Sequence, residues 1–366
     1  MKNVLFLIHG VGRQPVNWSA TALAALEEAM RLYPACFPAG KKLEDYVDIA
    51  EIRYDDIFDH ILDQWAQLAN SLPQAAGFDW VDEIGKLLKK AGDERTVFAR
   101  YGGDVLLYCG FALVARAVRL RVNSVIATRI ADAVARSEGG DPPKFAVLAH
   151  SLGSAIAQDS LHQLVTGDWL AERSAVKARL PGAAPAADAP DATFPAGLHA
   201  LFLVSDTSPL LHQAATLYSH LRTATGSFEC KSVCVVGHDF DPICHAGRKF
   251  IRPAPAPRSS IASVRVRHFH QEGIHDLAHY LSHPGVHAPL FAALIPDFSI
   301  ACFESARQLA ATAEWQGLGG KLKDRLEADR EALEQKLRGM VTRRPSIQAL
   351  RRIFEAYARK IEGVLP

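Results

Sequence analysis

The feature that most constrains this chain is an apolar run that stops abruptly at a serine. After Lys144 the run covers residues 145–149 and leads into the pentapeptide Ala-His-Ser-Leu-Gly at 149–153, which helix-favouring residues follow at once. A buried strand, a sharp turn and a helix account for this pattern. The serine of such a turn has a strained backbone, so the residues two before and two after it must be small. Ala149 and Gly153 meet this requirement, and we therefore expect Ser151 to be a nucleophile rather than a helix cap.

A second informative stretch lies near the N-terminus. Residues 4–8 are apolar and lead into the segment His-Gly-Val-Gly at 9–12. This pattern predicts a buried strand and then an irregular loop whose backbone N–H groups are not engaged in strand pairing. An acyl-transfer enzyme needs such donors where the oxyanion develops. Taken alone, the loop fits a tight turn before a helix at 20–31 equally well, but together with the serine turn it favours an oxyanion hole.

The two motifs, in this order and each after a strand, resemble the lipase and esterase branch of the α/β-hydrolase superfamily. A turn of the form Ala-x-Ser-x-Gly also occurs in some bacterial lipases. The resemblance covers roughly residues 1–60 and 140–290, and it implies a triad in the chain order serine, acid, histidine with no cofactor. It also implies that the N–H groups of Val11 and Leu152 hold the oxyanion. The residues expected to support this loop and turn are His9, Gly10, Gly12 and His150.

Strand-like segments alternate with helical ones along much of the chain. The expected strands are residues 4–8, 46–54, 144–149, 198–205, 231–236 and 261–270. This alternation predicts an α/β protein with a mostly parallel sheet of about six strands, covered by helices on both faces. With the resemblance, it implies an α/β-hydrolase fold that lacks the usual antiparallel first pair of strands. The last strand alternates in polarity and should lie at an edge.

The remaining segments predict additions to this sheet. We expect a hydrolase domain over residues 1–300 with a helical insertion at about 56–137, and a C-terminal helical hairpin at 301–366. The segment 105–115 is apolar all round and predicts a buried helix too short to span a bilayer. The segment 181–191 is of low complexity and predicts a surface loop. The insertion is the material available to wall a hydrophobic acyl pocket, and it could also form a lid.

Three aspartates are candidates for the acid that orients the catalytic histidine. Asp241 is the preferred one because Pro242 holds it extended, and because Asp-Pro-Ile resembles the acid turn of the superfamily. Asp239 lies two residues earlier and can face the same side. Asp206 follows the expected strand after the nucleophile. The last two stay open as alternatives.

The base is harder to choose, because the chain has 15 histidines. The superfamily order places the base in the loop after the last strand. His275 lies in that loop, between a strand-breaking glycine and Asp276, which can cap the next helix. His279 and His270 remain alternatives. His275, His279, His283 and His287 are spaced by four, but Pro284 and Gly285 interrupt that helix, so no metal site is expected.

Composition limits the other classes of function. The formal net charge is +1 and 49% of the residues are hydrophobic, which gives no electrostatic reason to expect a nucleic-acid partner. The six cysteines do not form paired motifs and are expected to be buried, reduced thiols. We expect no transmembrane segment, no targeting segment and a cytoplasmic location.

The function expected from these observations is a serine hydrolase that cleaves carboxylic esters, acting on a small-molecule ester or a lipid. Ser151 would attack, His275 would relay the proton and Asp241 would orient His275. Three alternatives stay open: an acyltransferase or a thioesterase with the same triad, and a non-catalytic binding module. The apolar stripes of the C-terminal hairpin are expected to dock on the chain's own domain, with a homodimer through these helices as the alternative.

Overall fold

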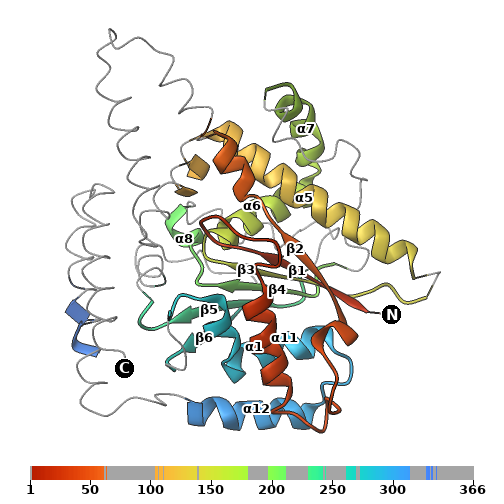
Figure 1. Ribbon diagram of the computed structural model, residues 1–366, viewed down its shortest axis with the longest axis vertical. Coiled ribbons are helices and arrows are strands. Elements are labelled where there is room, and N and C mark those ends of the chain that lie inside the picture. The colour runs from red at the N-terminus through yellow and green to blue at the C-terminus, as the bar shows by residue number, and fades with distance from the viewer. Residues whose placement is uncertain are drawn as a thin grey trace.

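The computed structural model describes residues 2–61, 63, 104–105, 107–109, 111–137, 140–179, 197–211, 230–241, 244, 261–268, 273–313, 327–329, 331–332 and 335. Three of the predicted features lie largely or wholly outside these residues: the helices that would wall an acyl pocket, the loop at 181–191 and the C-terminal hairpin. The described residues form an α/β fold around one sheet (Figure 1).

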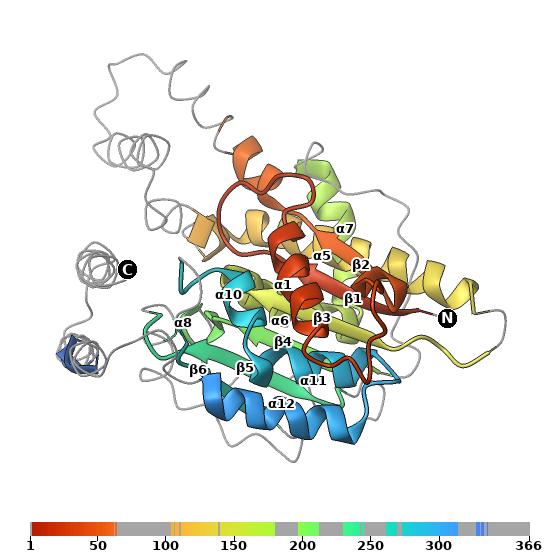
Figure 2. The same cartoon turned by 60° about the horizontal axis from the view of Figure 1, so that its bottom comes forward.

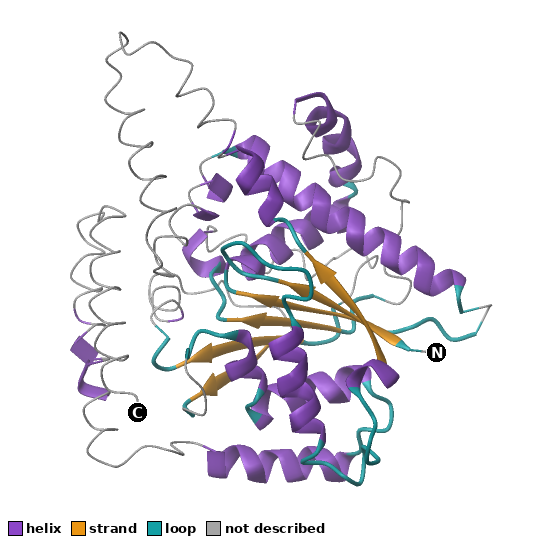
Figure 3. Cartoon of the chain, in the orientation of Figure 1, coloured by secondary structure: helices purple, strands orange, loops and turns teal. Residues whose placement is uncertain are grey.

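The sheet has six strands, as predicted, and every strand pair in it is parallel. The strands are β1 (Asn3–Ile8), β2 (Val47–Ile52), β3 (Phe145–His150), β4 (Ala200–Val204), β5 (Val233–His238) and β6 (Ile261–Val266). Their order is β2-β1-β3-β4-β5-β6, so β6 lies at an edge as expected. Figure 3 shows all the arrows pointing towards the same side of the molecule. The strand β6 ends four residues before the predicted end at 270.

Strand order reverses between β1 and β3. From β1 the chain passes to β2 on one side of β1, and then to β3 on its other side. The connections leave the sheet on opposite faces at this point, and in open α/β sheets such a switch point is where ligands bind. The loop at 9–12 follows β1 and Ser151 follows β3, so both predicted motifs lie at this switch point.

The core consists of two hydrophobic clusters, one on each face of the sheet. Side chains in a strand alternate between faces. In β1 the residues Val4, Phe6 and Ile8 accordingly lie in one cluster, while Leu5 and Leu7 lie in the other. The same alternation recurs in β3 and β4. A strand buried on both faces has to be apolar without interruption, which explains the continuous runs in the sequence.

The helices divide between these two faces (Figures 1 and 2). On the first face lie α5 (Ala112–Ala135), α6 (Leu152–Thr166) and α7 (Asp168–Arg179). On the second lie α1 (Ala20–Met30), α10 (Leu277–Leu281), α11 (Pro284–Leu294) and α12 (Ile300–Ala313). Two short helices, the 3₁₀ helix η1 (Leu43–Asp45) and α8 (Ser208–Leu211), complete the named elements. Helices therefore cover both faces of the sheet, as predicted.

Two local predictions were wrong. The helix expected at 105–115 is not continuous, because Phe111 has an extended backbone (φ −125°, ψ 97°) and α5 begins only after it. Cys36 and Cys302 were expected to be thiols, but they form a disulfide between α12 and the segment after α1. Cysteines 266 positions apart give no pairing signal in the sequence. None of the helices in the described ranges combines the length and apolar character needed to cross a bilayer.

Candidate active site

Ser151 lies at the turn between β3 and α6, at the carboxyl edge of the sheet. Its backbone has a positive φ (φ 55°, ψ −126°) and the residue is 1% exposed. The N–H group of Ser151 donates to the carbonyl of Val204 at 2.9 Å, and its own carbonyl accepts from the hydroxyls of Ser154 at 2.6 Å and Thr207 at 2.9 Å. These bonds hold a backbone conformation that is strained for a residue with a side chain.

Two glycines let the end of β1 approach this turn. A Cβ atom on Gly153 would clash with the carbonyl oxygen of His9 and lie 2.8 Å from that of Ile8. A Cβ atom on Gly10 would lie 2.9 Å from Cβ of Ser151 and 3.3 Å from its Oγ. The loop after β1 is therefore packed directly against the serine. A small residue is required two positions after the serine, at Gly153, because the two backbones approach each other closely there.

The side chains of Asp241 and His275 form a hydrogen bond at the same edge of the sheet. Asp241 lies just after β5 and is fully buried, whereas His275 precedes α10 and its side chain is 21% exposed. The distance from Nδ1 of His275 to Oδ2 of Asp241 is 2.7 Å. A carboxylate can only accept, so Nδ1 carries the proton in this pair. The nitrogen left to take another proton is then Nε2.

Asp241 is surrounded by further hydrogen-bond donors. Its Oδ2 atom accepts from the hydroxyls of Ser205 at 2.7 Å and Tyr280 at 2.6 Å. Burial by itself would raise the pKa of this carboxyl. The neighbouring His275 ring and the donors outweigh burial, and they hold the pKa of Asp241 well below its usual range. The carboxylate is thus charged at every pH at which the protein would work.

His150 connects the serine turn to His275. Its Nε2–H group donates to the backbone carbonyl of His275 at 2.8 Å, and the centroids of the two rings are 4.8 Å apart. Burial, together with repulsion from the His275 ring, lowers the pKa of His150 to about 3. His150 is therefore neutral near pH 7. Because it directly precedes Ser151 in the chain, this contact places His275 beside the turn.

The other candidates for acid and base contact different groups. Asp239 accepts hydrogen bonds from Arg265 at 3.0 Å and from Arg267 at 2.5 Å. Asp206 accepts from the backbone and the hydroxyl of Ser208, as a turn residue does. His279 is fully buried, and its ring stacks on His268 with centroids 4.3 Å apart. The remaining alternative, His270, lies outside the described residues.

Two backbone N–H groups near Ser151 are candidates for an oxyanion hole. Leu152 is the first residue of α6, where N–H groups have no partner within the helix and the helix dipole favours negative charge. Val11 lies in the loop after β1. In the part of the chain that the structure describes, no acceptor is found for the N–H group of either residue. Tyr54 restrains this loop, because its hydroxyl donates to the carbonyls of His9 at 2.6 Å and Gly10 at 2.9 Å.

Sequence reasoning missed Ser205 and Tyr280, which both contact Asp241. Ser205 has a positive φ of 49° directly after β4, and a serine immediately after a buried strand was the available signal. Tyr280 lies in α10, and nothing in the sequence around it marks it as a partner of Asp241. Within the described ranges, no cluster of three or more histidine, cysteine or acidic side chains is arranged to hold a metal ion.

Comparison of the chain with protein-family models, with curated proteins and with solved structures finds no match.

Proposed function

We propose that this protein is a serine hydrolase of the α/β-hydrolase type that cleaves carboxylic esters. The observation that carries the proposal is the hydrogen bond from Nδ1 of His275 to Asp241, in a histidine that also contacts His150, the residue before Ser151 and its positive φ. An imidazole held in this tautomer presents Nε2 as a base, and a serine needs such a base to become nucleophilic. The neighbouring loop after β1 supplies the backbone donors that an oxyanion requires.

In the first half of the reaction, Oγ of Ser151 attacks the carbonyl carbon of the ester and its proton passes to Nε2 of His275. The carbonyl oxygen becomes an oxyanion, which the N–H groups of Val11 and Leu152 stabilise. When the tetrahedral intermediate collapses, the bond to the alcohol breaks and the proton on Nε2 goes to the departing oxygen. An acyl group remains attached to Ser151.

In the second half, a water molecule gives a proton to Nε2 of His275 and its oxygen attacks the acyl carbon. The second tetrahedral intermediate uses the same two N–H groups. Its collapse breaks the bond to Oγ of Ser151, which recovers its proton from His275, and the carboxylic acid leaves. Asp241 keeps its charge throughout and stabilises the imidazolium that forms in each half.

The proposal is tested by labelling the purified full-length chain with a fluorophosphonate, which reacts with activated serines. We expect the wild type to be labelled and Ser151→Ala to remain unlabelled. Ser160→Ala is the matched control, because Ser160 is a buried serine on the same helix, α6, and should be labelled like the wild type. Equal labelling of wild type and Ser151→Ala would remove the nucleophile assignment.

Hydrolysis of p-nitrophenyl butyrate by the same variants completes the test. We expect turnover by the wild type and by Ser160→Ala, and none above the uncatalysed rate by Ser151→Ala. Labelling together with a single stoichiometric release of p-nitrophenol, but no turnover, would show that the acyl-enzyme forms and needs an acceptor other than water. A protein that is neither labelled nor active would be a binding module, and the proposal would then be wrong.

A further inference from the structure

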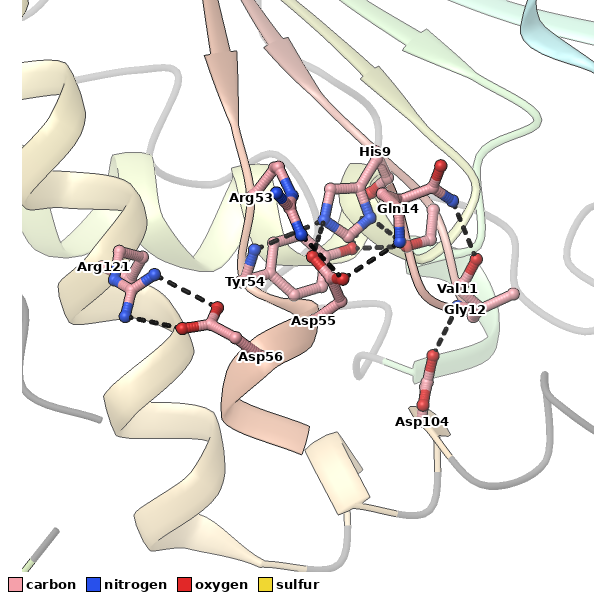
Figure 4. Close-up of polar contacts among 11 residues, drawn as sticks. His9, Val11, Gly12, Gln14, Arg53, Tyr54, Asp55, Asp56, Asp104 and Arg121 are labelled. Carbon is pink, nitrogen blue, oxygen red and sulfur yellow. Dashed lines mark hydrogen bonds and ion pairs between the residues drawn. The ribbon is translucent and has the colours of Figure 1, made fainter. Parts of the chain in front are cut away.

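The loop after β1 is held by carboxylates that belong to two separate parts of the chain. The N–H group of Gln14 donates to Oδ2 of Asp55 at 3.0 Å, and the N–H group of Gly12 donates to Oδ2 of Asp104 at 2.6 Å. Figure 4 shows Asp55 and Asp104 approaching the loop from different segments. A main-chain segment with two of its amides bound in this way is restrained in orientation.

The two bonds differ in what they connect. Asp55 lies three residues after the end of β2, and β2 pairs with β1. The bond from Gln14 to Asp55 therefore connects the segments that follow two neighbouring strands. Asp104 is 92 residues from Gly12 and belongs to the insertion predicted at 56–137. Of the insertion residues that the structure describes, Asp104 is the one that bonds to the backbone of this loop.

The position of Gly12 gives this bond its significance. Gly12 has a φ of 88°, a conformation that a residue with a side chain rarely adopts, and it directly follows Val11. Because adjacent peptide groups share one Cα atom, fixing the N–H of Gly12 restricts how the Val11 N–H can rotate. Gly10, on the other side of Val11, is already fixed against Ser151. The Val11 peptide is thus held between two restrained neighbours.

We propose that Asp104 is a positioning residue through which the helical insertion controls the oxyanion hole. While its carboxylate holds the N–H of Gly12, the N–H of Val11 is directed towards the oxyanion. When this bond is broken, the loop loses that orientation and the serine reacts slowly. The inference rests on the proposed function, since it assigns regulation to the same site.

The charge of Asp104 makes this bond sensitive to pH. Burial raises the pKa of Asp104 to about 6, although the Gly12 N–H and the nearby His9 oppose that rise, while Asp59 and Asp55 add to it. A carboxyl with a raised pKa carries its charge only above that pKa. The charge-assisted bond to Gly12 is therefore complete above roughly pH 7 and is lost as the pH falls through about 6.

The first experiment compares three variants of the full-length chain. Asp104→Ala removes the acceptor, whereas Asp104→Asn keeps an acceptor oxygen but carries no charge. Asp56→Asn is the matched control, because Asp56 pairs with Arg121 at 3.1 Å on the neighbouring helix α5 rather than with the loop (Figure 4). The measurements are the rate of fluorophosphonate labelling, and kcat and KM for p-nitrophenyl butyrate.

We expect Asp104→Ala to lower kcat and the labelling rate by about ten- to a hundredfold, as loss of one charge-assisted hydrogen bond does. KM should change by less than about threefold, because the bond acts on the transition state. Asp104→Asn should recover only part of the loss, because its amide oxygen accepts a hydrogen bond without a charge, and Asp56→Asn should stay within about twofold of the wild type. A melting curve for each variant checks that it is folded.

The second experiment measures kcat/KM of the wild type and of Asp104→Asn between pH 5 and pH 8. The ratio of the two cancels the pH dependence that the rest of the site gives to both proteins. We expect this ratio to be constant above roughly pH 7 and to fall towards one below about pH 6, where the wild type loses its charge. This test does not depend on whether Asp104→Ala folds.

The outcomes separate the two proposals. If the wild type is not labelled at Ser151, the proposed function fails. If the wild type is labelled and folded Asp104→Ala is labelled at the same rate, only the role of Asp104 fails. A ratio that does not change with pH, or that rises as the pH falls, also overturns that role. Such a result would mean that the charge on Asp104 has no effect on the oxyanion or destabilises it.

Discussion

At the scale of single residues, Asp241 is the group on which the most interactions converge. It is fully buried, yet one of its oxygens accepts from His275, Ser205 and Tyr280. A buried charge is costly unless it is fully hydrogen-bonded, and these donors offset that cost. Asp239 is almost as buried, but its carboxylate is paired with two arginines and not with the imidazole of His275.

We predict that Asp241→Asn lowers kcat by about 10⁴-fold. Asparagine keeps the shape of the side chain, but its amide favours the tautomer of His275 that has the proton on the wrong nitrogen. Asp239→Asn and Asp206→Asn should each lower kcat by less than about tenfold, because Asp239 binds two arginines and Asp206 binds the backbone of a local turn. Turnover of p-nitrophenyl butyrate by the three folded variants measures this. A larger loss at Asp206 or Asp239 would move the role of the acid there.

At the scale of elements, the end of β1 and the start of α6 are packed backbone against backbone. Gly153 is the residue that allows this, because the carbonyl groups of Ile8 and His9 occupy the space of its missing side chain. Both carbonyls belong to the backbone, so neither can rotate away as a flexible side chain could. The contact joins the serine turn to the loop that carries Val11, so the relative position of the two halves of the site depends on Gly153 as well as on Gly10.

We predict that Gly153→Ala destabilises the protein by about 3 kcal/mol or more, since a main-chain segment must shift to admit the methyl group. Gly167→Ala is the control at the other end of α6. Gly167 has a φ of 76° with open space around it, so alanine there adds only conformational strain of about 1 to 2 kcal/mol. Urea unfolding curves give both values. Equal losses at the two positions would mean that the steric contact at Gly153 is relieved without cost.

At the scale of the whole molecule, the Cys36–Cys302 disulfide joins distant parts of the chain. It links the segment after α1 to α12, across a sequence separation of 266 residues. Both helices lie on the same face of the sheet, together with α11. A cross-link of this length restricts the unfolded chain strongly and so stabilises the folded one.

We predict that reduction of this disulfide lowers the free energy of unfolding by about 2 to 5 kcal/mol. Denaturant unfolding with and without dithiothreitol measures the change. The double variant Cys36→Ala, Cys302→Ala should be insensitive to the reductant, although four other cysteines remain in it. If the double variant responds to dithiothreitol as the wild type does, the effect arises elsewhere.

The sequence by itself determined the parallel sheet and its six strands. Continuous apolar runs can be buried only between two layers of helices, and this physical requirement is local to each strand. The serine turn was equally readable, because the small residues at 149 and 153 record a steric demand in adjacent positions. Strand ends were less well predicted: β6 stops four residues early, since the alternating pattern continues past the last residue that pairs.

Only the tertiary structure decided which side chains meet. Asp206, Asp239 and Asp241 all follow strands at the same edge, and nothing in the local sequence says which carboxylate faces His275, 34 residues beyond Asp241. The disulfide and the bond from Asp104 to Gly12 join residues 266 and 92 positions apart. Such contacts depend on how helices and loops lie over the sheet. Patterns of periodicity are produced by neighbours in the chain and carry no record of contacts made in space.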